Sequence, residues 1–123
     1  MKVALPVWDK RLSPVLDFAH RLLVAKIQNR AVMQRWYHPI NPQLSIFSQA
    51  AVLSHLGIEV LICGSLSSDL SDMIQSSGIR IIPGLTGDVE EILHAFLNNR
   101  LAEPRFRLPG ANAGSRRFQS RKR

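Results

Sequence analysis

The second half of the chain alternates two hydrophobic patterns. Residues 58–63 form an almost unbroken apolar run, which is typical of a strand buried on both faces of a parallel sheet. Residues 79–83 repeat this pattern over a shorter span. Apolar residues recur at helical spacing over three segments, residues 43–56, 66–77 and 88–99. We therefore expect helices that alternate with parallel strands and pack against the sheet.

The first half of the chain has the pattern of an antiparallel unit. Residues 2–7 are β-branched and apolar and predict a first strand, followed by a polar turn over residues 8–12. Ser13 and Pro14 suit the start of a short helix, because serine caps a first turn and proline is tolerated at its first position. Residues 21–27 and 31–37 flank a polar turn and predict a β-hairpin. Together the two halves predict a three-layer α/β sandwich with a mixed sheet of about five strands.

Length and composition limit the number of domains. A chain of 123 residues with 46% apolar content can bury one core but has no room for two. No apolar run approaches the roughly 20 residues that a membrane helix needs. The first residues lack the apolar stretch of a signal peptide, so we expect a cytoplasmic protein. With one cysteine, Cys63, the sequence allows no internal disulfide.

The positive charge lies at one end of the sequence. Residues 1–99 contain eight Lys or Arg and eight Asp or Glu, whereas residues 100–123 contain eight Lys or Arg and only Glu103. After Leu101 the composition changes to Arg, Pro, Gly, Ser and Asn with almost no apolar periodicity. We therefore expect a domain over residues 1–101 and a basic, disordered tail over residues 102–123, mobile from about residue 104 unless a partner orders it.

The tail suggests one class of partner. Its basic residues are interleaved with Phe106 and Phe118, and arginine charge with aromatic stacking suits single-stranded nucleic acid or an acidic protein surface. A solubilising extension with nonspecific affinity for polyanions is the other interpretation. The candidate partner-binding residues are Arg105, Arg107, Arg116, Arg117, Arg121, Lys122 and Arg123.

Three segments of the chain resemble one known family. They are MKVALPVWDKRLSPVLDFAHRLLV, LGIEVLICGSLSSDL and SGIRIIPGLTGDVEEILHAFLNNRL, and their order covers about residues 1–101. In this respect the chain is similar to the dinitrogenase iron-molybdenum cofactor biosynthesis family, of the NifX and NifB carboxy-terminal type. The resemblance implies a ribonuclease H-like fold. It also implies a cytoplasmic protein that binds or carries iron-molybdenum cofactor or its iron-sulfur precursors, together with cofactor-assembly proteins as partners.

The resemblance also implies where a cluster would bind. The site would lie at the sheet edge near Ser13, Val15 and Cys63, with Gly64 and Ser65 in the turn that follows the buried strand. Candidate metal ligands are Cys63, His20 and His38. The alternative for Cys63 is a small buried hydrophobic residue, and the alternative for residues 64–68 is a plain strand-to-helix turn.

Two positions depart from the family pattern. Many members have a histidine where this chain has Val15, which cannot coordinate iron. The similar subgroup has a cysteine pair where this chain has Ala111 and Asn112. Because clusters are held mainly by thiolates, Cys63 is left as the single protein thiol. A second hypothesis follows, in which the protein has lost its cluster ligands and acts as an interaction or regulatory protein through its basic tail.

Nothing in the sequence predicts catalysis. No histidine is placed beside a serine or cysteine nucleophile by a sequence motif, and His55 and His94 fit a helix end and a solvated helix face. A ribonuclease H-like fold raises the question of a metal-dependent nuclease, but Asp9, Asp17 and Glu59 do not form a convergent carboxylate pattern. We therefore expect a noncatalytic protein, monomeric or homodimeric, that does not bind membranes.

Overall fold

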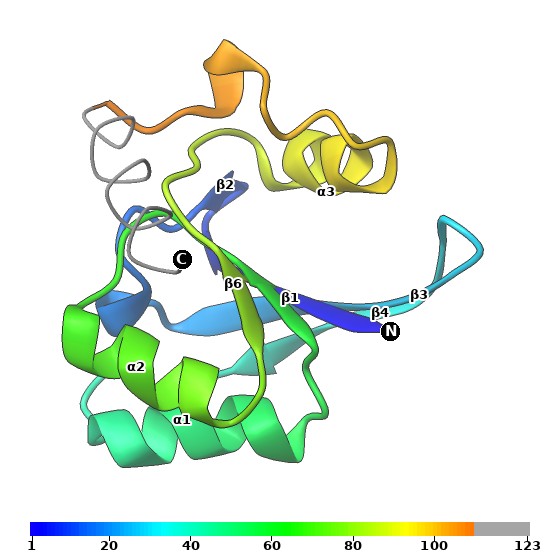
Figure 1. The fold of residues 1–123 in the computed structure, drawn as a ribbon. Helices are drawn as coiled ribbons and strands as arrows, with labels where there is room; N and C mark the ends of the chain where they lie inside the picture. Colours follow the sequence, from blue (N-terminus) through cyan, green and yellow to red (C-terminus); the bar gives the residue numbers. More distant parts are fainter. Residues whose placement is uncertain (110–123) are drawn as a thin grey trace.

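The computed structural model describes residues 1–109, in which strands and helices follow the order shown in Figure 1. The strands are β1 (Lys2–Trp8), β2 (Arg11–Leu12), β3 (Arg21–Gln28), β4 (Ala31–Pro39), β5 (Val60–Ile62) and β6 (Arg80–Ile82). The helices are α1 (Ile46–His55), α2 (Ser68–Ser76) and α3 (Val89–Leu97), with 3-10 turns η1 (Leu16–Phe18) and η2 (Pro104–Phe106).

The strands form one mixed, open sheet. Its order is β4-β3-β1-β5-β6, and the short β2 pairs with β1. β3 pairs antiparallel with both β1 and β4, whereas β5 pairs parallel with both β1 and β6. The expected mixed sheet is therefore confirmed. The sixth strand, β2, was not expected, because a two-residue strand has no pattern that distinguishes it from a polar turn.

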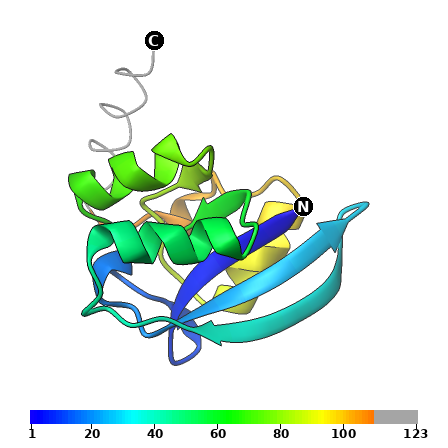
Figure 2. The same cartoon turned by 90° about the horizontal axis from the view of Figure 1, so that it is seen from below.

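Helices cover both faces of the sheet. α1 and α2 lie on one face and α3 lies on the other, as Figures 1 and 2 show. Alternate residues of each central strand enter the two cores, so that Leu5 and Leu23 pack with α3, while Ala4 and Val24 pack with α1 and α2. This arrangement confirms the predicted three-layer α/β fold. No helix among residues 1–109 is long and apolar enough to span a membrane.

Side-chain caps set where the helices begin. Ser45 accepts a hydrogen bond from the Ser48 N–H, Ser67 from Leu70, and Asp88 from the first turn of α3. α1 and α2 therefore begin two or three residues later than the apolar spacing alone suggests. The short helix expected after Ser13 is only the 3-10 turn η1, because Val15 is extended and bridges to Ser65.

The packed part of the chain continues beyond the expected boundary at residue 101. η2 places Phe106 in the core beside α3, where its side chain is 2% exposed. Thr86 donates to the Phe106 carbonyl at 2.8 Å, and Leu108 donates to the Gly84 carbonyl at 2.9 Å. This corrects the expectation that the chain is mobile from residue 104, since one aromatic anchor holds residues 104–108 against the domain.

Candidate functional site

Three turns meet at the carboxyl edge of the sheet, where the sequence predicts the cofactor site. They span residues 13–17, 64–67 and 84–87, and they follow β2, β5 and β6. The Ser65 N–H donates to the Pro14 carbonyl at 2.8 Å, and the Leu16 N–H donates to the Ser65 carbonyl at 2.8 Å. The Gly84 N–H donates to the Gly64 carbonyl at 2.7 Å. The three turns are therefore joined directly, backbone to backbone.

Gly64 lets the first two turns approach this closely. A Cβ atom at this position would lie 2.6 Å from the Pro14 carbonyl oxygen and 3.0 Å from that of Ser13. The Ser65 hydroxyl also donates to the Pro14 carbonyl at 3.0 Å, and the Asp17 carboxylate accepts from the Ser67 N–H at 2.9 Å. Hydrogen bonds and close packing thus fill the space between these turns.

The predicted site residues differ in how far solvent reaches them. Ser13 is buried, and its hydroxyl donates to the Val15 carbonyl at 3.2 Å. Ser65 is exposed. The structure therefore brings Ser13, Val15, Gly64 and Ser65 together, as expected, but the hydroxyls of both serines are engaged with backbone carbonyls.

Cys63 lies beneath these turns at the end of β5. Its side chain is 0% exposed. Burial raises the pKa of the Cys63 thiol to about 12, and the nearby charge of Asp17 adds to the increase. The thiol is therefore protonated at neutral pH, whereas a cluster ligand must be a thiolate. Ligation by Cys63 stays a prediction that requires this edge to open, and the observed burial agrees with a core role.

The two candidate histidines lie on the antiparallel side of the sheet. His20 is exposed in the bend before β3, and its carbonyl accepts from the Ile40 N–H at 2.9 Å. His38 is half-buried on β4, opposite Leu22. Within residues 1–109, no three or more His, Cys, Asp or Glu side chains form a group that could hold a metal ion. The predicted ligand set of Cys63, His20 and His38 is therefore not assembled.

Two of the three carboxylates considered for a nuclease, those of Asp17 and Glu59, serve other contacts. Asp17 holds the Ser67 N–H, as described above. Glu59 lies just before β5, and its carboxylate is 3.9 Å from the amino-terminal ammonium of Met1. Asp9 lies in the turn between β1 and β2 with a φ of 58°. These positions give no carboxylate cluster of the kind that binds two divalent ions.

The described part of the tail is already engaged with the domain. The Arg105 guanidinium donates to Glu103 at 3.0 Å and to Glu91 at 3.2 Å, and it lies 4.4 Å from the Phe106 ring centroid. Because Phe106 is buried, it cannot stack on a base, contrary to the interpretation of the sequence. Arg107 is exposed, and its backbone forms an isolated β-bridge with Leu85. The remaining candidates, Arg116, Arg117, Phe118, Arg121, Lys122 and Arg123, lie outside the described residues.

A cavity that was not predicted lies at the opposite edge of the sheet. It has a volume of about 630 Å³ and lies between the carboxyl end of α3, the hairpin turn and the start of β6. Arg30 and Arg80 both line it. No local pattern in the sequence marks this site, because the two arginines are far apart in the chain and each one alone is typical of an ordinary surface residue.

Known structures share this fold. No protein-family model matches the sequence, and a search of curated proteins finds no match. The apo orange protein from Desulfovibrio gigas superposes with a TM-score of 0.68 at 22% identity, over 80% of this chain and 88% of that one. A Methanocaldococcus jannaschii protein provisionally assigned as a dinitrogenase gives 0.66 at 18% identity, over 81% and 90% of the two chains. A Thermotoga protein provisionally assigned as NifB gives 0.67 at 17% identity, over 80% and 89%. The chain therefore shares its fold with these three proteins.

Proposed function

We propose that this protein is a noncatalytic carrier of the nitrogenase cofactor type, with an iron-molybdenum cofactor or an iron-sulfur precursor as its cargo. The observation that carries the proposal is the meeting of three turns at the carboxyl edge of the sheet. In open α/β sheets, ligands bind outside the carboxyl ends of the strands. The shared fold with a provisional dinitrogenase, a provisional NifB and the orange protein supports the same function class.

The residues present do not fit a cluster held by thiolates. Cys63 is buried and protonated, so any cargo contact falls to exposed groups on the same edge. Isolated backbone β-bridges join Arg11 to Asp88 and Arg107 to Leu85, which brings both arginines beside the turn that follows β6. Positive charge attracts an anionic cluster without a covalent bond. Weak, exchangeable binding of this kind suits a protein that must release its cargo.

Anaerobic reconstitution tests the proposal. The full chain is loaded with an iron-sulfur cluster or with isolated iron-molybdenum cofactor, passed through gel filtration, and analysed for iron, molybdenum and visible absorbance. We expect metal to co-elute with the protein and to fall as salt is raised, because charge attraction is screened. Cys63→Ala is expected to retain as much metal as the natural sequence.

The controls separate the possible modes of binding. Arg11→Gln should retain less metal than Lys26→Gln, which removes one exposed charge from β3. Retention that requires Cys63 would show that the edge opens and that the carrier uses a thiolate after all. Metal that is lost completely on desalting from every form would refute the carrier function.

The charge distribution favours one second candidate, an interaction protein that binds nucleic acid or an acidic partner. Residues 110–123 contain five Lys or Arg and no acidic residue. Its test is binding of a single-stranded oligonucleotide and of a polyglutamate peptide, with and without residues 110–123. Truncation after Pro109 is the correct design, because removal of residues 104–109 would take Phe106 out of the core. Affinity that survives this truncation would exclude the tail as the binding element.

A further inference from the structure

We infer that the cavity at the amino edge of the sheet is a binding site for a small molecule with an apolar body and an anionic group. This site is separate from the carboxyl edge, so the inference does not rest on the proposed carrier function. The cavity volume of about 630 Å³ falls within the range of small-molecule sites, roughly 300–1,000 Å³.

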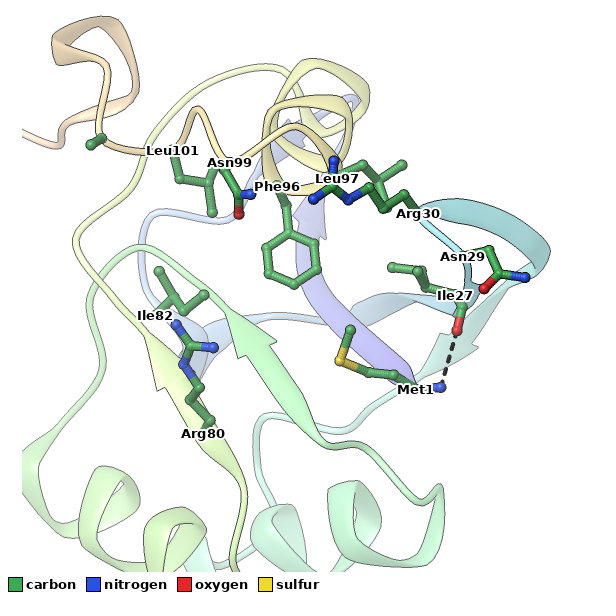
Figure 3. Close-up of a pocket in the computed structure, with 11 residues that line it drawn as sticks. Met1, Ile27, Asn29, Arg30, Arg80, Ile82, Phe96, Leu97, Asn99 and Leu101 are labelled. Atoms are coloured by element: carbon green, nitrogen blue, oxygen red, sulfur yellow. Dashed lines mark hydrogen bonds between the residues drawn. The ribbon is translucent and has the colours of Figure 1, made fainter.

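The cavity has an apolar floor. Side chains from β3, β6 and α3 contribute, and several of them also pack against the main core. Figure 3 shows the Phe96 ring extending from α3 into the space, with Ile82 on one side of it and Ile27 on the other. The apolar lining residues are Ile27, Ile82, Phe96, Leu97 and Leu101. An apolar ring or chain placed here would leave water and contact side chains that are now half-buried.

Two arginines give the cavity its charge. Arg30 enters from the hairpin turn and Arg80 from the start of β6, and in Figure 3 they lie on different sides of Phe96. Neither guanidinium has an ion pair or hydrogen bond to another side chain within residues 1–109. The lining includes no Asp or Glu, and Glu59 lies outside it, paired with the Met1 ammonium at 3.9 Å. The uncompensated charge of this cavity is therefore positive.

The backbone at both arginine positions is fixed without a ligand. Asn29 and Arg30 have φ values of 54° and 61°, as in a type I′ turn, which fixes how the hairpin closes. The Arg80 N–H donates to the Glu59 carbonyl at 3.0 Å within the parallel ladder. A guanidinium offers two parallel N–H groups to a carboxylate, sulfonate or phosphate. The observed combination thus matches an anionic head on an apolar body.

A fluorescence titration of the full chain tests this inference. The probe is 1-anilinonaphthalene-8-sulfonate, an aromatic sulfonate, and the reference probe is the uncharged N-phenyl-1-naphthylamine. The test variant is Arg30→Gln/Arg80→Gln, and the matched control is Lys10→Gln/Lys26→Gln, which removes two exposed charges that do not line the cavity. Glutamine keeps an L side chain at position 30, so the turn should be as strained as before.

The expected result is a selective loss of affinity. The dissociation constant of the sulfonate should rise about tenfold in the test variant, because two partly exposed ion pairs are lost, and should change less than about twofold in the control. Affinity for the uncharged probe should be the same in both variants. Amide resonances of Ile82, Phe96 and Leu97 should shift when the sulfonate is added.

Three results would overturn the inference. Equal loss in both double variants would mean general charge attraction. Unchanged sulfonate affinity in the test variant would remove the arginines from the site. Resonance shifts confined to residues 13–17 and 64–67 would place the probe at the other edge. Thermal unfolding of each variant confirms that the comparison is made on folded protein.

Discussion

Substitution of Gly64 by alanine should loosen the junction of the turns and expose Cys63. The added Cβ would lie 2.6 Å from the Pro14 carbonyl oxygen, whereas real Cβ contacts are essentially never closer than 3.0 Å. That oxygen belongs to the backbone and cannot rotate away, so the two turns must separate. The cost is steric, because Gly64 is not one of the glycines with positive φ.

The size of the effect follows from the hydrogen bonds at risk. Two backbone bonds of 2.8 Å link Pro14 to Ser65 and Ser65 to Leu16, and each contributes about 0.5–1.5 kcal/mol. Their loss should reduce the free energy of local opening by about 1–3 kcal/mol. The rate at which a thiol reagent modifies Cys63 should then rise about 5- to 150-fold, if opening precedes reaction.

The assay is modification of the single thiol by a chromogenic disulfide at pH 8, with urea unfolding measured in parallel. Gly78→Ala is the matched control, since its φ is +85° and nothing lies within 4 Å of the added Cβ. It should cost about 1 kcal/mol through backbone strain and should leave Cys63 protected. A Gly64→Ala protein with natural stability and a protected thiol would show that the turns are not locked together.

Three other predictions concern stability. Phe106→Ala should lower the free energy of unfolding, measured in urea, by about 3–5 kcal/mol, whereas Arg105→Ala should lower it by less than about 1 kcal/mol. Equal losses of stability would contradict the anchoring role of η2. Burial raises the pKa of Cys63 above its ordinary value of 9.0, so ionisation of this thiol favours the unfolded chain. The contribution of Cys63 to the free energy of unfolding is therefore complete below pH 9 and should be lost at higher pH, by about 1 kcal/mol at pH 10. Cys63→Ala should lack this part of the decline in a pH series of melting curves. The Arg35 hydrogen bond lowers the pKa of Glu90, so Arg35→Met should cost up to about 1 kcal/mol at pH 7 and nothing once pH falls well below 4.5; a cost that is independent of pH would point to packing instead.

Local patterns in the sequence predicted most of the fold. The hairpin of β3 and β4 and the helices α1, α2 and α3 each have a periodicity that short windows reveal. β3 and β5 read as apolar runs because both of their faces are covered. β2 and η2 were missed for a different reason, since two or three residues are too few to show a period. Phe106 in particular is hidden among charged neighbours, although it alone anchors its segment in the core.

The state of the candidate site depends on contacts that no local pattern encodes. The sequence predicts Ser13, Cys63 and Ser65 at one edge, and in the structure Ser65 donates to the carbonyl of Pro14, the residue after Ser13. It could not reveal that the turns would close over Cys63, because the closing bonds join residues about 50 positions apart. Arg30 and Arg80 are separated by a similar distance in the chain. Tertiary folding alone brings them to one cavity.

The strand order also has a consequence for how the sheet assembles. β1 occupies the centre, with β3 and then β4 added on one side and β5 and then β6 on the other. On each side, the strands follow one another outward in the order in which a ribosome makes them. We therefore expect β1, β3 and β4 to form an early antiparallel template through short loops, whereas β5 must close a loop of more than 50 residues before it can pair with β1. Until then, one edge of β1 presents unpaired backbone groups, and this interval is when the growing chain is most exposed to aggregation.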